Sequence, residues 1–377
     1  MKKKILVLFG TRPEAIKLAP VISELKKSKK FKSIICSTGQ HREMLKQVLD
    51  IFKIKIDIDL DLMLPNQNLF DISVNTLEKL KNYYLEIKPD VVVVQGDTTT
   101  AFIASLAAFY LKIKVAHVEA GLRSYNKMSP FPEEVNRRFI SIIADYHFVP
   151  TLPSMNNLIT EGFSKQQIWV TGNTVIDSLL SVKTLLTKKS IKEKILNSFK
   201  THFPIEILSK KTVLITMHRR EKFGAEFIKI LEVIRRIATK YLDYYFIYPV
   251  HLNPNVQKPV TKILGKLKNV ILLPPLDYLT FVFLMSKCSF IISDSGGVQE
   301  ECYVFRKPIL VTRDVTERNE AIKAGYAFLV GSDEKKIYSK FKMVDKKISQ
   351  NFDFFTKPNP FGDGRAAKKI VKILENI

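Results

Sequence analysis

The sequence has little cysteine and no metal-binding pattern. Its 3 cysteines, Cys36, Cys288 and Cys302, lie far apart along 377 residues, in or beside apolar runs. Free cysteines in such surroundings are usually buried thiols, whereas disulfide frameworks belong to oxidising compartments. No pair of cysteine or histidine residues has the spacing of a structural zinc site. We therefore expect a protein of a reducing compartment that holds no metal.

Long apolar runs are also missing. The longest candidate, residues 101–111, contains Ser105 and Tyr110 and falls short of the roughly 20 residues that a membrane-spanning helix needs. The lysines at the N-terminus precede an apolar segment, residues 5–9, that is too short for a signal peptide. The expectation is a cytoplasmic protein with no membrane partner.

Two familiar nucleotide-binding motifs are absent, the Gly-x-Gly-x-x-Gly fingerprint and the Walker lysine loop. Tightly bound NAD and ATP hydrolysis therefore lose support, and we expect no cofactor. The net charge of +23 comes from lysines spread along amphipathic segments, such as residues 24–27 and 262–266. No basic and aromatic RNA-binding pattern accompanies them, so nucleic acid is not an expected partner, whereas a phosphorylated metabolite fits the charge.

What the chain does contain is a regular alternation of short β-rich segments and helical patterns, too long for one core. This alternation predicts an α/β fold with two doubly wound Rossmann-like domains facing a cleft. A lysine-rich, helix-prone bridge, residues 182–211, separates the two sets. The predicted strands are residues 5–9, 34–36, 91–94, 115–118, 147–149 and 168–170, then 213–216, 245–248, 270–273, 290–293, 309–311 and 328–330.

Three acidic residues stand where predicted strands end. Asp97 follows the run of four valines at 91–94, Glu119 follows residues 114–118, and Glu133 lies in a proline-marked loop just beyond. Parallel sheets bind ligands outside the carboxyl ends of their strands, so these acids are candidates for one shared site. The alternative for Asp97 is an N-cap of the helix that follows.

A glycine turn in the second half of the chain is a candidate anion site. The predicted strand 290–293 leads into Ser295, Gly296 and Gly297, where free backbone N–H groups and a helix N-terminus would favour a phosphate. Glu301 lies about one helical turn further on, where a carboxylate can accept from a ribose diol. The alternatives are a plain turn and a solvated helix acid.

Two corners supply cations at equivalent strand ends. Arg12 follows the first strand, and His218 follows the strand at 213–216, in front of two arginines. Cations that converge on one cleft are what a diphosphate requires. The alternative is a packed or surface histidine, with arginines that pair with neighbouring glutamates.

Motifs from the first strand to the last helix are similar to one known family. They lie at residues 10–14, 38–42, 95–99, 117–123, 130–137, 170–173, 218–221, 248–254, 293–301, 316–318 and 359–364. Together they resemble the non-hydrolysing UDP-N-acetylglucosamine 2-epimerases. The resemblance implies a glycosyltransferase-B architecture and a homodimer. It also implies an acid–base domain of residues 1–172, a UDP-binding domain of residues 173–360, and a C-terminal helix, residues 361–377, that returns to the first domain.

The resemblance also assigns residues by position. The implied catalytic set is Asp97, Glu119, Glu133 and His218. The implied substrate contacts are Arg12, Lys17, Arg137, His218, Leu276, Phe281, Ser295, Gly296, Gly297, Glu301 and Arg318. Among these, the glycine turn would hold the diphosphate, Glu301 the ribose, and Leu276 with Phe281 the uracil.

A second, activating site occurs in some members of this family, lined by residues that match Gln40, His41 and Arg42 together with an arginine at the position of Asn66. Asparagine offers no charged fork for a diphosphate. We therefore expect weak or absent activation, and the alternative role of His41 and Arg42 is to support the cleft wall.

The implied activity is reversible C2 epimerisation of UDP-N-acetylglucosamine to UDP-N-acetylmannosamine, by elimination of UDP to a glycal and re-addition. Three acids around one cleft meet its need for two acid–base groups. The alternatives are a hydrolysing 2-epimerase that releases N-acetylmannosamine, a 2-epimerase of a related UDP-2-acetamido sugar, a glycosyltransferase, and a binding module without catalysis.

Overall fold

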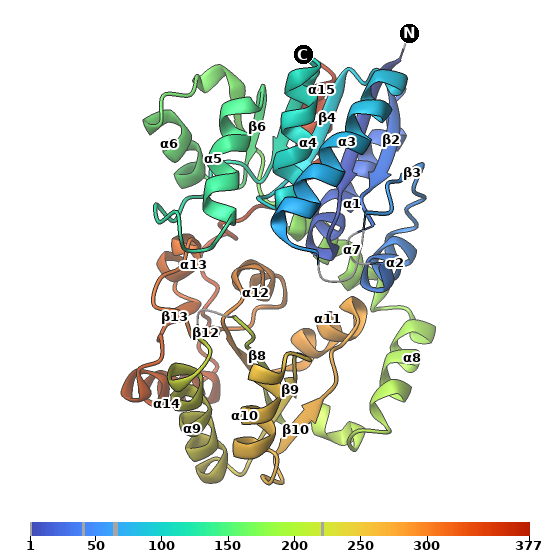
Figure 1. The fold of residues 1–377 in the computed structure, drawn as a ribbon. Coiled ribbons are helices and arrows are strands. Elements are labelled where there is room, and N and C mark those ends of the chain that lie inside the picture. The colour runs from blue at the N-terminus through green and yellow to red at the C-terminus, as the bar shows by residue number, and fades with distance from the viewer. Residues whose placement is uncertain (1, 40–41, 63–66, 220–221) are drawn as a thin grey trace. The chain divides into compact units, whose positions relative to one another are not determined.

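The computed structural model describes residues 2–39, 42–62, 67–219 and 222–377, and it divides into two compact units (Figure 1). Unit 1 comprises the chain up to Ser178 together with Phe361–Ile377, and unit 2 comprises Leu179–Pro360. Each unit has its own parallel sheet with helices on both sides.

In the described part of unit 1, the sheet has the order β3-β2-β1-β4-β5-β6-β7, and all neighbours pair in parallel. The order reverses between β1 and β4, which makes that position the topological switch point, where ligands of such sheets bind. The strands are β1 (Lys3–Phe9), β2 (Phe31–Ser37), β3 (Ile58–Asp59), β4 (Val91–Gln95), β5 (Lys114–Val118), β6 (Tyr146–Val149) and β7 (Ile168–Val170). The helices are α1 (Arg12–Lys27), α2 (Arg42–Phe52), α3 (Leu69–Ile87), α4 (Thr99–Tyr110), α5 (Glu133–Ile143), α6 (Leu152–Thr160), η1 (Lys165–Gln167), α7 (Thr174–Leu185), which continues into unit 2, and α15 (Ala366–Leu374).

Unit 2 repeats the plan with the strand order β10-β9-β8-β11-β12-β13, again all parallel. Its switch point lies between β8 and β11. The strands are β8 (Lys211–Thr216), β9 (Tyr244–Pro249), β10 (Val270–Leu273), β11 (Phe290–Ser293), β12 (Ile309–Val311) and β13 (Ala327–Leu329). The helices are α8 (Lys189–Phe199), η2 (Ile205–Ser209), α9 (Ala225–Lys240), α10 (Pro254–Leu264), α11 (Tyr278–Lys287), α12 (Gly296–Glu301), η4 (Cys302–Phe305), α13 (Asn319–Ala324) and α14 (Glu334–Ser349).

The predicted α/β class with two doubly wound sheets is confirmed, and every predicted strand is present with bounds that differ by at most three residues from those expected. The short strand β3 was not predicted, because two residues carry no periodic signal. The first helix begins at Arg12, directly after the capping residue Thr11. The three cysteines are buried and free, as predicted. None of the helices in the described ranges has the length and apolar character that crossing a bilayer requires.

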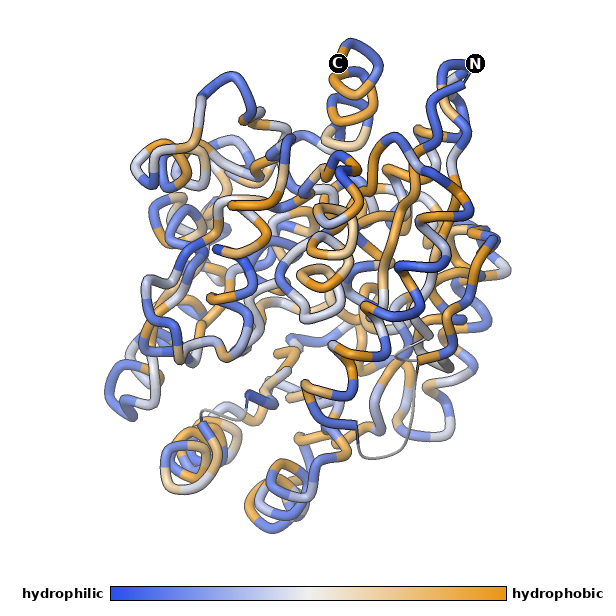
Figure 2. The backbone as a smooth tube through the Cα atoms, turned by 45° about the horizontal axis from the view of Figure 1, so that its top comes forward, coloured by the Kyte–Doolittle hydropathy of each residue, from blue (hydrophilic) through white to orange (hydrophobic). Residues whose placement is uncertain are grey.

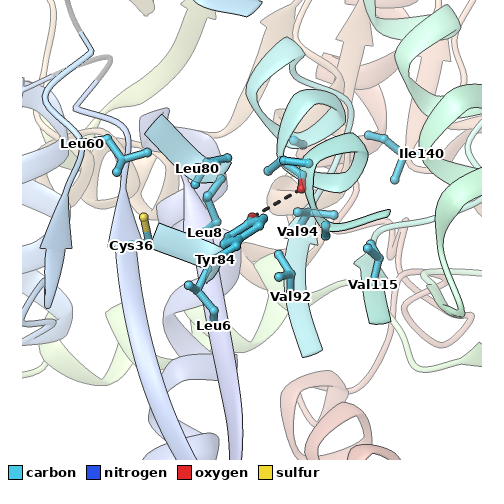
Figure 3. Close-up of a cluster of buried hydrophobic side chains, with 14 of the residues drawn as sticks. Leu6, Leu8, Cys36, Leu60, Leu80, Tyr84, Val92, Val94, Val115 and Ile140 are labelled. Atoms are coloured by element: carbon cyan, nitrogen blue, oxygen red, sulfur yellow. Dashed lines mark hydrogen bonds between the residues drawn. The ribbon is translucent and has the colours of Figure 1, made fainter. Parts of the chain in front are cut away.

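The strands of both sheets consist largely of buried apolar residues, whereas hydrophilic and hydrophobic residues alternate along the helical coils (Figure 2). In unit 1, alternate residues of β1 and β4 point toward α3 and α4 because side chains alternate along a strand (Figure 3). Tyr84 lies among them, and its hydroxyl donates to the carbonyl oxygen of Ala104 at 3.4 Å, which satisfies its polar end inside the core. This packing fixes the strands whose ends carry the candidate acids.

The last segment of the chain returns to unit 1, where α15 packs on α1. Two glycines allow the return: a Cβ on Gly172 would lie 3.2 Å from the Cα of Gly362, and both residues have positive φ angles. The backbone N–H of Asn173 donates to the carbonyl oxygen of Phe361 at 2.7 Å. Asp177 accepts from the first two backbone N–H groups of α15. The returning segment therefore holds the start of α7 and Asn173, the residue just before that helix.

We predict that Leu80→Ala destabilises unit 1 by about 2–5 kcal/mol, because Leu80 is fully buried between α3 and the sheet. Leu85→Ala on the same helix is the matched control, since Leu85 is 49% exposed. Urea unfolding followed by the fluorescence of Trp169 reports on unit 1, because this single tryptophan lies in β7. Equal shifts of the unfolding midpoint in the two variants would contradict the placement of this core.

Candidate functional site

Asp97 and Glu119 leave neighbouring strands at one edge of the unit 1 sheet. The last residues of β4 and β5, Gln95 and Val118, are paired, and the N–H of Gly96 donates to the carbonyl oxygen of Val118 at 3.0 Å. Glu119 has a φ of 67°, which is uncommon for a residue other than glycine. Backbone of this kind persists where the surrounding structure holds it.

Glu133 is the first residue of α5 and does not lie in a loop, which corrects the prediction. Proline was interpreted as a loop signal, but Pro132 stands at the N-cap position, and proline is also compatible with a helix start. Arg137, four residues on and therefore on the same face, donates through Nε to Asp97 Oδ2 at 2.8 Å. Asn136 Nδ2 donates to the backbone carbonyl oxygen of Asp97 at 2.9 Å. The structure thus brings Glu133 onto the helix face that contacts Asp97.

Asp97 does not cap α4, so the alternative reading of this residue is wrong. The cap is Thr98, whose hydroxyl accepts from the backbone N–H of Ala101 at 3.0 Å. The carboxylate of Asp97 pairs with Arg137, whose side chain is only 5% exposed. A half-buried acid with a buried cationic partner has a defined orientation, as an acid–base group requires.

Glu119 is 7% exposed, and side chains from two distant segments contact it. Lys17 Nζ lies 2.7 Å from Oε1 and 2.5 Å from Oε2, and Asn173 Nδ2 donates to Oε2 at 2.8 Å. The resemblance implied that Lys17 contacts substrate, and the structure places its ammonium beside a candidate catalytic acid. Charge-assisted bonds of this kind hold a carboxylate firmly in place.

Three polar residues near these acids were not predicted as site residues from the sequence. Glu134 accepts from Arg137 Nη1 at 2.7 Å, and His117 Nε2 donates to the carbonyl oxygen of Gly96 at 2.7 Å. Burial lowers the pKa of His117 to about 4, against the opposing effect of that bond, so the ring is neutral near pH 7. The third residue is Glu14, which stands three positions after Thr11. This Thr-x-x-Glu spacing is the signature of a capping box and could have revealed it.

In unit 2, Asp294 spans the switch point. It follows β11, and its Oδ2 accepts from the backbone N–H groups of His218 and Arg219, each at 2.8 Å, beyond the end of β8. The imidazole of His218 is exposed and stacks on His251, with ring centroids 5.3 Å apart and planes 8° from parallel. His218 is therefore held through its backbone while its ring stays accessible.

The predicted glycine turn is present directly after Asp294. Ser295 stands at the N-cap position, and Gly296 and Gly297 form the first turn of α12. A Cβ on Gly297 would lie 3.8 Å from Glu301 Oε1, so the carboxylate of half-buried Glu301 folds back toward the turn. This arrangement differs from that of a solvated helix acid.

Arg318 is buried beside the same turn. Its Nε donates to Glu300 Oε1 at 2.7 Å, and its Nη1 pairs with Glu317 Oε1 at 2.8 Å. Arg313 lies 2.9 Å from the other oxygen of Glu317. Burial alone would raise the pKa of Glu317, but the charges of Arg318 and Arg313 outweigh it and hold that pKa at about 2. Neither glutamate was predicted as a site residue: Glu300 lies beside the predicted Glu301, and Glu317 follows neither a strand nor a turn signal.

The remaining candidate residues lie near the starts of helices or outside the described residues. Arg12 begins α1 and is half-buried; Leu276 precedes Asp277, the N-cap of α11, and Phe281 lies in the first turns of that helix, both half-buried. Gln40, His41 and Asn66 lie outside the described residues, and so does the side chain of Arg42. In the described ranges, no group of three histidine, cysteine, aspartate or glutamate side chains is arranged to hold a metal ion.

Two doubly wound parallel units, with acids at one switch point and a glycine turn at the other, define a protein of glycosyltransferase-B type. A family model described as UDP-N-acetylglucosamine 2-epimerase matches residues 23–375. The UDP-N-acetylglucosamine 2-epimerase of Campylobacter jejuni is 49% identical, over 99% of this chain and 98% of its own. This chain therefore belongs to the UDP-N-acetylglucosamine 2-epimerase family, which confirms the resemblance found in the sequence.

Solved structures agree with that assignment. The Neisseria meningitidis UDP-GlcNAc 2-epimerase bound to UDP-GlcNAc has a TM-score of 0.94 and 48% identity, with 99% of this chain and 100% of that chain covered. The Methanocaldococcus jannaschii UDP-GlcNAc 2-epimerase in complex with UDP-GlcNAc and UDP has a TM-score of 0.83 and 32% identity, with the same coverage.

We predict that Glu317 makes unit 2 sensitive to acid. Its folded pKa of about 2 lies below the ordinary 4.5, so its stabilisation is fully present above about pH 4.5 and is lost as the pH falls toward 2. At about 1.4 kcal/mol per pKa unit, the loss is about 3 kcal/mol. Thermal unfolding between pH 6 and 3 should therefore show a flatter acid slope for Glu317→Gln than for the wild type. Glu334→Gln, at an exposed ion pair with Arg236, is the control and should keep the wild-type slope.

Proposed function

We propose that this chain interconverts UDP-N-acetylglucosamine and UDP-N-acetylmannosamine without hydrolysis, by eliminating UDP and adding it back. The observation that carries the proposal is a pair of carboxylates, Asp97 and Glu119, held at adjacent strand ends by Arg137 and Lys17. Membership of the 2-epimerase family supports the choice of substrate, since a relative with 48% identity binds UDP-GlcNAc.

The first step has to make the C2 hydrogen acidic, because no carbonyl group stands next to it. The bond between C1 and the UDP oxygen breaks, and UDP leaves with the electron pair. The oxocarbenium-like centre at C1 then acidifies C2–H, and a carboxylate removes the proton to leave a glycal. A phosphate leaving group needs cations and N–H donors more than a proton donor.

In the second step, UDP adds back to C1 while a proton reaches C2 from the opposite face. Two faces require two acid–base groups, and Asp97, Glu119 and Glu133 are the candidates. Glu119 has a lysine and an amide as partners, whereas Asp97 has an arginine. The two acids are therefore held by different partners on adjacent strand ends.

In this proposal unit 2 binds the nucleotide. The diphosphate takes the N-terminus of α12 at Gly296 and Gly297, where helix N–H groups are available. His218 and Arg318 supply positive charge or hydrogen bonds to the same group. Glu301, folded toward Gly297, accepts from the ribose hydroxyls, and the half-buried side chains of Leu276 and Phe281 border the uracil.

A hydrolysing 2-epimerase would share the first step and let water complete the second. A glycosyltransferase of the same fold would require an acceptor. We place the non-hydrolysing reading first because the motifs of this chain match that branch of the family from the first strand to the last helix. The homodimer implied by the resemblance stays a prediction.

We predict that product formed in deuterated water carries deuterium at C2, because the proton that a side chain removes exchanges before another returns. Proton NMR of the sugar, with UDP-N-acetylglucosamine as the only substrate, measures this incorporation and identifies the products. A C2 position that stays fully protonated would contradict elimination. Equal accumulation of UDP and free N-acetylmannosamine would instead show a hydrolysing enzyme.

We predict that Asp97→Asn, Glu119→Gln and Glu133→Gln each lower kcat by about a hundredfold or more, the range of acid–base groups, with smaller effects on UDP binding. Asp145→Asn is the control, since Asp145 bonds to the amino end of β5, the opposite end of the strand that leads to Glu119. His218→Ala should also weaken UDP binding. An amide variant with turnover near that of the control would remove its residue from the acid–base set.

A further inference from the structure

The ladder between β1 and β4 ends before the strands do. Residues 5–7 pair with residues 91–93, whereas β1 continues to Phe9 and β4 to Gln95. Each strand keeps its outer neighbour to the end: Phe9 pairs with Ser37 of β2, and Gln95 with Val118 of β5. The two strands therefore separate at the switch point, beside the segment that carries Asp97.

One buried carboxylate joins the two segments across this separation. Glu14 is 1% exposed, and its Oε2 accepts from the backbone N–H of Gly10 at 3.2 Å and from the N–H and hydroxyl of Thr11, each at 2.7 Å. Its Oε1 accepts from the hydroxyl of Thr98 at 2.8 Å. Four donors therefore surround the two oxygens. Burial still outweighs these bonds and raises the pKa of Glu14 above its ordinary value.

Thr98 connects this carboxylate to the site. It is the residue after Asp97, and its hydroxyl donates to Glu14 while it accepts from Ala101 at the start of α4. The same helix, α1, carries Lys17 one turn beyond Glu14, and Lys17 pairs with Glu119. The start of α1 therefore contacts the segments of both acids, through Thr98 for Asp97 and directly for Glu119.

We infer that Glu14 is a positioning residue: by fixing Thr98 across the gap between β1 and β4, it sets the place of Asp97 relative to Glu119. The inference rests on the proposed epimerisation. Glu14 is buried and reaches the reaction only through Thr98, so its loss affects turnover more than substrate binding. A displacement of about 1 Å in a reacting group lowers a rate by about a hundredfold.

The chain provides a matched control at the other end of the same strands. Asp90 stands before β4, and its Oδ2 accepts from the backbone N–H of Lys4 in β1 at 2.6 Å. It is thus a second carboxylate that joins β1 to the β4 segment, at the edge away from Asp97. Asp90→Ala removes one such connection without touching the acids or their partners.

The experiment measures kcat, KM and the melting temperature with UDP-N-acetylglucosamine for the wild type and for Glu14→Ala, Glu14→Gln, Thr98→Val, Thr98→Ser and Asp90→Ala. We expect Glu14→Ala and Thr98→Val to lower kcat by about 30- to 100-fold, with KM within about threefold. The double variant Glu14→Ala/Thr98→Val should lose no more of kcat than either single variant, because both substitutions remove the same connection. Thr98→Ser keeps the hydroxyl and should retain most of kcat, as Asp90→Ala should.

Three results would contradict the positioning role. Equal kcat for Thr98→Val and Thr98→Ser, or equal losses in Glu14→Gln and Asp90→Ala, would overturn the positioning role, even if Glu14→Ala failed to fold. Losses that simply add in the double variant would also overturn it. A wild-type protein that does not epimerise the sugar would instead overturn the proposed function, and the inference with it.

Discussion

The separation of β1 and β4 is the constraint around which unit 1 is organised. A parallel sheet whose order reverses must send its connections to opposite faces, which opens a crevice at the carboxyl ends of two strands. The N–H groups of Gly10 and Thr11, just past the end of β1, are bound there by a side chain, since buried backbone groups need partners. Glu14 meets this need, and it also accepts from the hydroxyl of Thr98, the residue after Asp97. The start of α1, which binds the backbone at this switch point, therefore also contacts the segments that carry the candidate acids.

Unit 2 has a corresponding contact at its own switch point, but there the carboxylate follows the other one of the two separating strands. There the carboxylate comes from Asp294, after β11, and it accepts from the backbone beyond β8. In unit 1 the carboxylate comes from α1, after β1, and reaches the segment beyond β4. Asp294 thus holds His218 through its backbone, and Glu14 holds Asp97 through the neighbouring Thr98. The side chains of Asp97 and His218 are consequently positioned while they remain accessible to a ligand.

Each unit contains a compensated set of buried charges. Arg137 lies between Asp97 and Glu134, and Glu317 lies between Arg318 and Arg313. Removing one member of such a set leaves a buried charge without its partner, which is strongly destabilising. The same residues thus serve stability and the proposed chemistry. The high net charge of the chain, by contrast, is carried mainly by lysines on exposed helix faces.

The sequence by itself determined the fold class, the strands and the edge where Asp97 and Glu119 lie, because buried parallel strands are apolar runs and a ligand site follows their carboxyl ends. It also determined the family, because motifs in a fixed order extend over the whole chain. Only the tertiary structure decided which side chains meet these acids. Lys17 reaches Glu119 across 102 residues and Asn173 reaches it across 54, and Glu133 proved to be the start of a helix that contacts Asp97. Such contacts depend on the order of strands in the sheet and on the closing of long loops, and no local pattern of residues encodes either.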